Sequence, residues 1–307
     1  MNILVTGGAG FIASHIVDRL IKLGYNTIIM DNFLKGKKEN LNSQASFYQL
    51  DITSPEIRDI FIAEEITHVI HHAGQVSVQE SINNPFFDAR SNILGTINLL
   101  ESCREFAVEK IIYASSAAVY GEPEYLPLDE EHPIKTISPY GLSKHTPEHY
   151  IQMYQHLYGL DYTILRYANA YGPRQDAKGE GGVISIFIDK ILSSQTPIIY
   201  GDGEQTRDFI YVGDIVEANI SSLTAGDGEI LNISTNLPIG VKQIYRTINQ
   251  IMDKDIKVNY QPARRGDIRD SYLDNSRAKE TLNWHPTFNL RKGLIHTLDY
   301  MIKEEIY

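Results

Sequence analysis

The chain has 307 residues, a length that favours two domains of roughly 150 residues each. Its hydrophobic share of 42% and its charged share of 22% are typical of a globular protein, and a core of this size closes without disulfides or metals. The formal net charge is −11, from 28 lysines and arginines against 39 aspartates and glutamates, with no basic block. Because phosphate backbones are bound by clustered cations, we expect no nucleic-acid partner.

We also expect no membrane partner. The apolar stretches, such as residues 62–70, are interrupted by charges and too short to span a bilayer. The opening letters MNILVTGG indicate a strand that enters a glycine turn rather than a signal peptide. The single cysteine, Cys103, cannot form an internal disulfide, which suits a reducing compartment. We therefore expect a cytoplasmic protein.

The first half of the chain alternates strand patterns with helix patterns. Runs rich in β-branched residues predict strands at 2–6, 26–30, 46–50, 68–72 and 110–114. Amphipathic segments between them predict helices at 11–23, 55–63 and 85–106. This alternation predicts an α/β protein with a Rossmann-type, doubly wound parallel sheet that helices cover on both faces.

The rhythm changes beyond about Arg166. Glycine-rich loops at 176–182 and 200–203 flank a predicted helix at 183–192, and strands are predicted at 208–212 and 229–233. Further helices are predicted near 242–252 and 291–303. We therefore predict a first domain at 1–166, with a return near 207–235, and a smaller C-terminal α/β domain formed mainly by 167–307.

The first predicted strand runs into a glycine turn. Gly7 permits a tight turn, Gly10 lets the backbone approach a pyrophosphate, and Ala13 supplies a small side chain where the helix packs on the strand. The helix that follows offers free N–H groups and a partial positive charge. Asp31, which follows the second strand, can accept hydrogen bonds from a ribose diol and repels a 2′-phosphate. The pattern predicts a dinucleotide site that takes NAD rather than NADP.

A second set of residues is typical of proton transfer. Tyr140 and Lys144 are four residues apart and share one face of a helix that Ser138 and Pro139 begin. An ammonium beside a phenol favours the phenolate, so we expect a lowered pKa for Tyr140, which could then act as a general base. Ser116 follows a predicted strand and completes the set.

Two features lie outside these motifs. His71 and His72 are adjacent on a predicted strand and point to opposite faces, so they predict a core or cofactor-wall role and no metal site. Pro147 lies within the helix of Tyr140, where it removes one backbone N–H. We expect a local kink at Pro147.

Together these motifs resemble the extended short-chain dehydrogenase/reductases, in their group of NAD-dependent nucleotide-sugar epimerases and dehydratases, and most closely the UDP-glucose 4-epimerases. The resemblance covers essentially the whole chain. It rests on TGGAGFIASH, HHAGQVSVQES, SNILGTINLL, SSAAVYG, PYGLSK, RYANAYGPR, GDGEQTRDFIYVGD and RRGDIRDSYLDNSRAKETLNW, with the pairs Asp31-Asn32 and Asp51-Ile52. It also implies a homodimer, formed by the helices near 85–106 and 138–158.

The resemblance implies a role for each matching position, in a first domain that binds the dinucleotide and a second that mainly binds a nucleotide sugar. The catalytic residues would be Ser116, Tyr140 and Lys144. NAD would be held by Gly7, Gly10, Phe11, Ile12, Asp31, Asn32, Asp51, Ile52, Ala73, Asn92, Tyr140, Lys144 and Tyr167. A UDP-sugar would be held by Ser116, Tyr140, Asn169, Val183, Tyr200, Arg207, Arg264, Asp267 and Ser271. The planar fork of an arginine suits the diphosphate oxygens.

The expected reaction is epimerisation of a UDP-hexose at C4, through a transient 4-keto sugar. Related 4,6-dehydratases carry an Asp-Glu pair where this chain has Ala117-Ala118, and two methyl groups supply neither acid nor base. A UDP-uronate 4-epimerase, a dehydratase and a non-catalytic dinucleotide-binding sensor remain the alternatives.

The identity of the sugar depends on Ser271 in this interpretation. Some UDP-glucose/UDP-galactose enzymes of the family carry Tyr at the matching position. A small side chain leaves room for a 2-acetamido group, so we hypothesise that UDP-GlcNAc and UDP-GalNAc are also used. The alternative is a serine that merely packs at the rim of the pocket.

Overall fold

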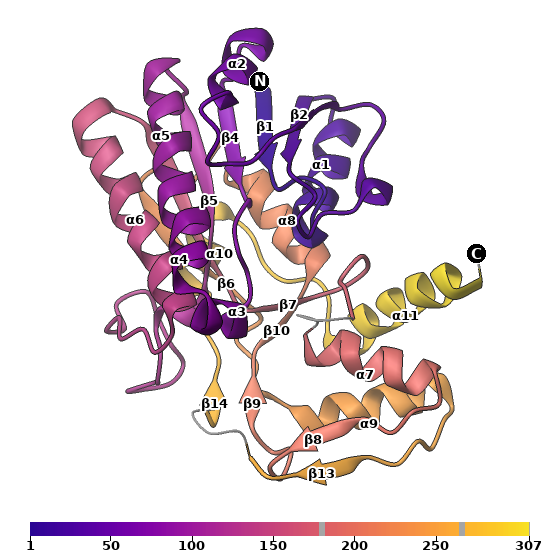
Figure 1. Cartoon of the computed structure of the whole chain (residues 1–307). Coiled ribbons are helices and arrows are strands. Elements are labelled where there is room, and N and C mark those ends of the chain that lie inside the picture. The colour runs from indigo at the N-terminus through magenta and orange to yellow at the C-terminus, as the bar shows by residue number, and fades with distance from the viewer. Residues whose placement is uncertain (178–181, 264–267, 307) are drawn as a thin grey trace.

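A seven-stranded parallel sheet forms the centre of the computed structural model, which describes residues 1–177, 182–263 and 268–306 (Figure 1). Its strand order is β11-β6-β5-β4-β1-β2-β3. The strands are β1 (Asn2–Thr6), β2 (Asn26–Asp31), β3 (Ser46–Gln49), β4 (His68–His71), β5 (Lys110–Ser116), β6 (Asp161–Tyr167) and β11 (Glu229–Ile233). The predicted fold class is confirmed. All five strands predicted in the first half are present, and β6 is one that the sequence analysis did not predict.

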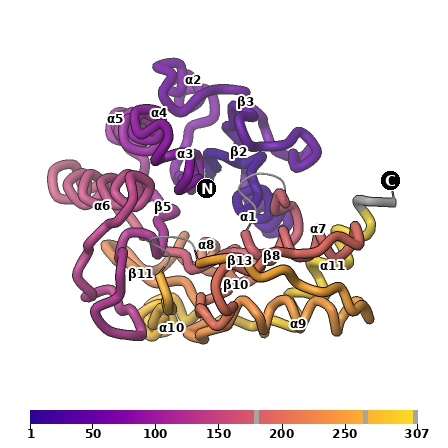
Figure 2. Tube along the Cα trace, turned by 60° about the horizontal axis from the view of Figure 1, so that its bottom comes forward, coloured from indigo at the N-terminus to yellow at the C-terminus, as the bar shows by residue number. Residues whose placement is uncertain are grey.

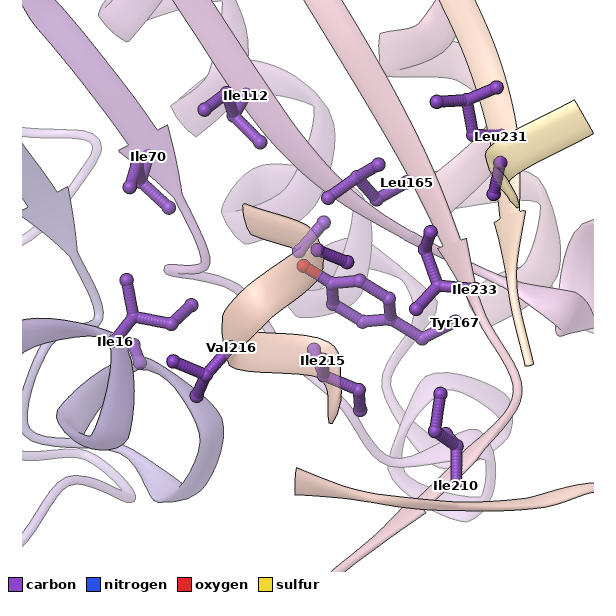
Figure 3. Packing of buried hydrophobic residues seen from close by; sticks show 14 of the residues in the cluster. Ile16, Ile70, Ile112, Leu165, Tyr167, Ile210, Ile215, Val216, Leu231 and Ile233 are labelled. Atoms are coloured by element: carbon purple, nitrogen blue, oxygen red, sulfur yellow. The ribbon is translucent and has the colours of Figure 1, made fainter. Parts of the chain in front are cut away.

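Helices cover both faces of this sheet, as expected. One face carries α1 (Phe11–Lys22), α8 (Val212–Ser221) and α10 (Ser276–Leu282), and the other carries α2 (Ile57–Glu64), α5 (Gly95–Glu105) and α6 (Pro139–Tyr158). Alternate residues of each strand face opposite layers, so Ile3 and Val5 pack into one core while Leu4 packs into the other. Figure 3 shows the first of these cores, in which the ring of Tyr167 lies among aliphatic side chains.

The elements after β6 form small sheets with a core of their own. β7 (Asn169–Tyr171) pairs with β10 (Phe209–Tyr211), and β8 (Ile198–Tyr200) pairs with β13 (Asn259–Gln261). A third sheet has the order β12-β9-β14, formed by β12 (Ile239–Gly240), β9 (Thr206–Arg207) and β14 (Asp270–Ser271). The helices are α7 (Val183–Leu192), α9 (Val241–Met252) and α11 (Leu290–Ile306). Figure 2 shows α7, β8, β13 and α9 side by side, away from α2 and α5.

The chain does not remain in this smaller part. After β10 it returns to the large sheet, where α8 packs against α1 and β11 pairs with β6. It then leaves again through β12 and α9. These are the residues for which a return was expected, and the exact domain boundary at residue 166 stays a prediction.

The segment predicted as one helix at 85–106 is built from three pieces. α4 (Pro85–Ala89) leads into a π-helical turn, Arg90–Leu94, and α5 follows directly. A short helix that was not predicted, α3 (Val78–Asn83), precedes them and is capped by Ser77. Short 3-10 turns occupy Lys38–Asn40 and Ala117–Val119. The π-helical turn inserts an extra residue into the helical repeat, and it contains Asn92, one of the predicted site residues.

α6 runs without a break through Pro147, whose side chain is buried. The local kink expected at Pro147 stays a prediction. Within the described ranges, no helix is both long and apolar enough to cross a membrane.

Candidate active site

The turn between β1 and α1 has the geometry that the glycine pattern predicts. Gly7 adopts a φ of +69°, and a Cβ on it would lie 2.8 Å from the backbone nitrogen of Ala73. Only glycine therefore fits between the first and fourth strands of the sheet. Gly10 is the N-cap of α1. Because it has no side chain that could cap the helix, the first N–H groups of α1 are free for a ligand.

The ends of β2 and β3 supply the polar groups beside this turn. Asp31 is buried, and its carboxylate accepts hydrogen bonds from the backbone N–H groups of Ala9 (3.0 Å) and Phe33 (2.7 Å). Burial raises the pKa of Asp31, and these two bonds oppose the rise. The side-chain amide of Asn32 donates to Asp51 at 2.7 Å, which joins the two predicted adenosine-binding pairs.

One cavity joins most of the predicted cofactor residues. The turn, the ends of β2 to β6 and the start of α6 all open into it, because the carboxyl ends of parallel strands meet at one edge of the sheet. The predicted residues that line it are Gly7, Gly10, Phe11, Ile12, Asp31, Asn32, Asp51, Ile52, Ala73, Ser116, Tyr140 and Tyr167. Two predicted cofactor residues, Asn92 and Lys144, are buried behind this lining.

Several lining residues were not among the predicted ones. Gly36 approaches Asp31 so closely that a Cβ on it would lie 2.6 Å from Oδ1. Gln75 lies two residues after Ala73, Arg174 ends the quoted RYANAYGPR motif after β7, and Gln175 follows that motif. A buried Nη1 of Arg174 and a buried Oε1 of Gln175 have no hydrogen-bond partner within the described part of the chain. The Arg174 guanidinium pairs with Asp18 through Nη2 at 2.8 Å and keeps Nη1 as a donor for an anion such as the pyrophosphate of a dinucleotide, whereas the Gln175 oxygen needs a donor such as a hydroxyl.

Ser116 and Tyr140 meet at the inner end of this cavity. Ser116 ends β5, its Oγ accepts from the N–H of Ala118 at 3.2 Å, and its hydroxyl lies close enough to that of Tyr140 to lower the pKa of the phenol. Ser138 caps α6 by accepting from the N–H of Gly141 at 3.0 Å, which fixes the start of the helix and with it the position of Tyr140.

The prediction that Lys144 lowers the pKa of Tyr140 is wrong for this structure. The Lys144 ammonium lies 4.7 Å from the ring centre of Tyr113, and burial lowers its pKa to about 8 against the opposing charges of Glu148 and Asp88. Burial raises the pKa of Tyr140, and the hydrogen bond from Ser116 offsets this only in part. Burial disfavours the charged phenolate by more than the neighbouring groups favour it. A further positive charge is therefore needed to favour the deprotonated form of Tyr140.

Asn92 holds the cavity wall in place. Its Oδ1 accepts from the N–H of Gln75 at 2.7 Å, and its Nδ2 donates to the carbonyl of Gln75 at 3.0 Å and to Ser143 at 2.9 Å. The buried side chain thus ties the loop after β4 to α6. Asn92 itself does not line the cavity.

Behind Ser116 and Tyr140 lies a buried ion pair that sequence reasoning missed. Arg166 on β6 binds Glu148 on α6 through two bonds, Nε–Oε1 at 3.0 Å and Nη2–Oε2 at 2.6 Å. Ser115 donates to the same carboxylate at 2.5 Å, and His145 contacts it at 3.1 Å. Burial alone would raise the pKa of Glu148, but these bonds and the charge of Arg166 hold it at about 2. The signal was present in the sequence, because Glu148 lies one helical turn after Lys144.

His71 and His72 occupy the wall positions expected of them. The His71 ring lies between Thr6 (2.7 Å) and Thr96 (3.0 Å), while His72 faces Tyr167 (3.3 Å) and Asn219. Burial lowers the pKa of His72 to about 3 and that of His71 well below its ordinary value. Both rings are therefore neutral, and their hydrogen bonds hold them in place.

Apart from Ser116 and Tyr140, the predicted sugar-nucleotide residues that the structure describes do not line this cavity. Arg207 on β9 is directly opposite Ser271 on β14, and Asn169 on β7 donates to the carbonyl of Asp208 at 3.0 Å. Val183 begins α7 and Tyr200 ends β8. Arg207 and Ser271 are thus opposite each other on paired strands, and Asn169, on the separate β7–β10 sheet, contacts Asp208 next to Arg207. Arg264 and Asp267 lie outside the described residues.

Comparison with known proteins gives consistent similarities. The model of the NAD dependent epimerase/dehydratase family matches residues 3–234. A UDP-glucose 4-epimerase from Thermotoga maritima, solved with UDP-glucose, is 44% identical, covers 99% of this chain and 100% of its own, and has a TM-score of 0.97. A UDP-N-acetylglucosamine 4-epimerase from Methanobrevibacter ruminantium M1 is 36% identical, with coverages of 99% and 98% and a TM-score of 0.95. A UDP-glucose 4-epimerase from Mycolicibacterium smegmatis is 37% identical over 98% of both chains.

The Glu148–Arg166 pair should dominate the acid sensitivity of the fold. Glu148→Gln leaves a buried guanidinium without its counter-charge, so the free energy of unfolding should fall by about 3–5 kcal/mol at pH 7. The pKa of Glu148 is about 2 in the folded protein against an ordinary 4.5, so its stabilisation is present above pH 4.5 and is lost as the pH falls towards 2.

Urea unfolding of the wild type and Glu148→Gln from pH 7 to pH 3 should therefore show a difference that shrinks below pH 4.5. Glu105→Gln is the control, because Glu105 is exposed and pairs with Arg58 at the surface. A difference between wild type and Glu148→Gln that stays constant down to pH 3 would contradict the assignment.

Proposed function

The chain belongs to the NAD-dependent epimerase/dehydratase family, and on this basis we propose that it interconverts UDP-glucose and UDP-galactose by epimerisation at C4. One observation supports this most directly. Ser116 and Tyr140 both line the dinucleotide cavity, the Ser116 hydroxyl lies close enough to the phenol to lower the pKa of Tyr140, and Lys144 follows one turn further along α6. Similar proteins named as UDP-glucose 4-epimerases match over nearly the whole chain.

The cavity residues fit NAD along its length. Asp31 and Asn32 would hold the adenosine ribose, Asp51 and Ile52 the adenine, and the N-terminus of α1 with Arg174 the pyrophosphate. When bound, oxidised NAD accepts a hydride from C4 of the sugar and later returns it, and its positively charged ring favours the phenolate of Tyr140.

The chain's own residues handle the proton and the orientation of the sugar. Tyr140 would take the proton of the 4-hydroxyl, and Ser116, whose hydroxyl lies beside that of Tyr140, would turn its single proton to the sugar oxygen. Oxidation leaves a 4-keto sugar, which must present its other face before C4 is reduced again. Binding at the far end, by Asn169, Arg207 and the residues proposed at 264 and 267, would hold the UDP group while the sugar turns.

The alternatives within the family are less well supported. A dehydratase needs an additional acid and base, and the residues that follow Ser116 are Ala117 and Ala118, in the short turn that leads away from β5. A UDP-uronate 4-epimerase shares the proton-transfer residues and differs only in the sugar. A non-catalytic sensor would have no use for a Ser116–Tyr140 contact at the end of its cofactor cavity.

The activity can be tested by following the anomeric protons of UDP-glucose and UDP-galactose by NMR, without added cofactor and then with NAD. We expect interconversion by the wild type and a loss of about 10²–10⁴-fold in Tyr140→Phe, which removes the proton-transfer group. Tyr158→Phe, an exposed tyrosine on the same helix, should keep full activity.

No interconversion by the wild type, even with NAD, would overturn the proposal for these two sugars. Turnover of UDP-glucuronate alone would identify the uronate epimerase, and NAD binding without turnover of any UDP-sugar would indicate the sensor. Equal activity in Tyr140→Phe would remove Tyr140 from its proposed role.

We also propose that UDP-GlcNAc and UDP-GalNAc are substrates. Ser271 lies across from Arg207 in the β9–β14 pair, which places a small side chain beside a proposed diphosphate ligand. One similar protein is named as a UDP-N-acetylglucosamine 4-epimerase. Ser271→Tyr should reduce turnover of the acetamido sugars about tenfold or more and spare UDP-glucose. A bulky side chain beside the sugar disfavours binding of the larger sugar in the transition state by about 1–3 kcal/mol.

The same NMR assay measures both substrate pairs in parallel, and Ser271→Ala is the matched control that keeps the side chain small. Equal losses on both pairs in Ser271→Tyr would show that Ser271 does not select the sugar.

We further propose a homodimer formed by the α4–α5 and α6 surface. These helices pack against each other and expose large apolar side chains: Phe86, Leu94, Leu142, Met153 and Leu157. Phe86 is 77% exposed, and exposed apolar side chains gathered on one surface mark interaction sites. The single cysteine, Cys103, is buried and unpaired, which supports our proposal of a reducing, cytoplasmic location.

Sedimentation equilibrium should show a dimer for the wild type and a monomer for Met153→Glu combined with Leu157→Glu, because buried unpaired carboxylates oppose association. Ile62→Glu, which adds a charge at an exposed residue of α2, should leave the dimer intact. A monomeric wild type, or a dimer that survives the double substitution, would contradict this interface.

A further inference from the structure

One buried carboxylate, that of Asp208, binds two separate parts of the chain. Asp208 follows β9 and is only 1% exposed. Its Oδ1 accepts hydrogen bonds from the backbone N–H of Thr235 at 2.9 Å and from the Thr235 hydroxyl at 2.7 Å. Its Oδ2 accepts from the N–H of Asn236 at 2.9 Å and from that of Leu273 at 3.4 Å. An ionised carboxylate only accepts, so four donors around it suit the charged form.

The backbone of Asp208 holds a third part of the chain. Its carbonyl accepts from the backbone N–H of Asn169 at 2.9 Å and from the side-chain amide of Asn169 at 3.0 Å. The next residue, Phe209, is opposite Asn169 in the β7–β10 pair. Asp208 therefore fixes both the position of Asn169 and the direction of its side chain.

The segments that meet at Asp208 carry three of the residues proposed to bind the UDP-sugar. Asn169 is bonded directly, Arg207 precedes Asp208, and Ser271 lies two residues before Leu273. β9 and β14, which carry Arg207 and Ser271, lie side by side below the large sheet in Figure 1. The turn that binds the carboxylate follows β11, an edge strand of that sheet, so the same group ties the small sheets to the large one.

Resting on the proposed function, we propose that Asp208 is a positioning residue of the UDP-sugar site, and that its carboxylate holds Arg207 and Ser271 in place relative to the large sheet. Asp208 does not line the dinucleotide cavity in the part of the chain that the structure describes. Loss of its carboxylate should therefore weaken UDP binding and leave NAD binding unchanged. The effect falls on affinity, because binding groups that are fixed beforehand need less ordering when the ligand arrives.

A second buried carboxylate has the same local geometry and provides a matched control. Asp214 is 2% exposed, and its Oδ1 accepts from the N–H and the hydroxyl of Thr287, both at 2.9 Å. Its Oδ2 accepts from the N–H of Phe288 at 3.2 Å. Asp214 fixes the segment before α11 to α8, and it lies on none of the strands proposed to bind the UDP-sugar. Asparagine at either position disturbs the same kind of buried turn, but only the change at Asp208 should affect UDP.

Calorimetric titration with UDP measures the affinity of the site without turnover. Asp208→Asn places an amide N–H where an oxygen accepted, so the Kd for UDP should rise about tenfold or more. The KM for UDP-glucose should rise with it, while kcat and the Kd for NAD should stay within about twofold. Asp214→Asn should lose comparable stability in urea unfolding and bind UDP as the wild type does.

Thr235 provides a milder pair of variants, which keeps the test valid if Asp208→Asn does not fold. Thr235→Val removes only the hydroxyl donor and should raise the Kd for UDP about threefold, whereas Thr235→Ser keeps the donor and should leave the Kd unchanged.

Three results would overturn the role of Asp208: wild-type UDP affinity in folded Asp208→Asn, an equal loss of affinity in Asp214→Asn, or wild-type affinity in Thr235→Val. UDP binding by a wild type that interconverts no UDP-sugar would overturn the proposed function and leave the role of Asp208 in place. A wild type that does not bind UDP would overturn both.

Discussion

The buried ion pair between Arg166 and Glu148 is the interaction on which the reaction centre depends. It joins β6 to α6, and β6 lies beside β5, the strand that ends in Ser115 and Ser116. The Glu148 carboxylate also accepts from Ser115, so a single group fixes both the helix that carries Tyr140 and Lys144 and the strand that carries Ser116. A charge pair with no access to water tolerates little displacement, because every lost bond leaves a buried charge unsatisfied.

The topology of the sheet, rather than proximity in the sequence, brings the functional groups together around this pair. Six parallel strands, β1 to β6, end at the same edge, and each contributes a turn or a side chain to one cavity. Asn92 adds a second tie, since its amide binds the loop after β4 and α6 together. The wall of the cavity is therefore tied together by buried hydrogen bonds. The residues proposed for the sugar nucleotide lie on short two- and three-stranded sheets with a separate core.

Local patterns predicted the regular elements well and the irregular ones poorly. The helix at 183–192 and the strand at 229–233 match α7 and β11 residue for residue, because each shows a clear apolar pattern bounded by turns. β6 was not predicted although its letters DYTILRY are rich in strand-forming residues. The apolar pattern did not predict the π-helical turn at Arg90–Leu94. The extra residue of this turn is favoured by contacts that Asn92 makes with residues distant in the sequence, which a local pattern does not contain.

The same division holds for the site. Gly7, Gly10, Asp31, Ser116, Tyr140 and Tyr167 line the cavity as expected, because a motif states both the residue and its place at a strand end. Arg174, Gln75 and Gly36 were missed, since their positions depend on how loops fold back over the sheet. The pKa of Tyr140 was expected to fall and instead rises, because sequence spacing gives the neighbour of a phenol but not its burial.

By itself, the sequence determined the alternation of strands and helices, the glycine turn, the acidic residue after the second strand and the proton-transfer residues. These are local properties, set by hydrophobic period, backbone freedom and side-chain chemistry within a few residues. Only the tertiary structure decided which groups are dehydrated and which charges meet. Glu148 finds Arg166, and Asn92 finds Gln75 and Ser143, because sheet order and helix packing bring together segments that are separated along the chain. Burial and long-range pairing are properties of the packed whole, so no local pattern contains them.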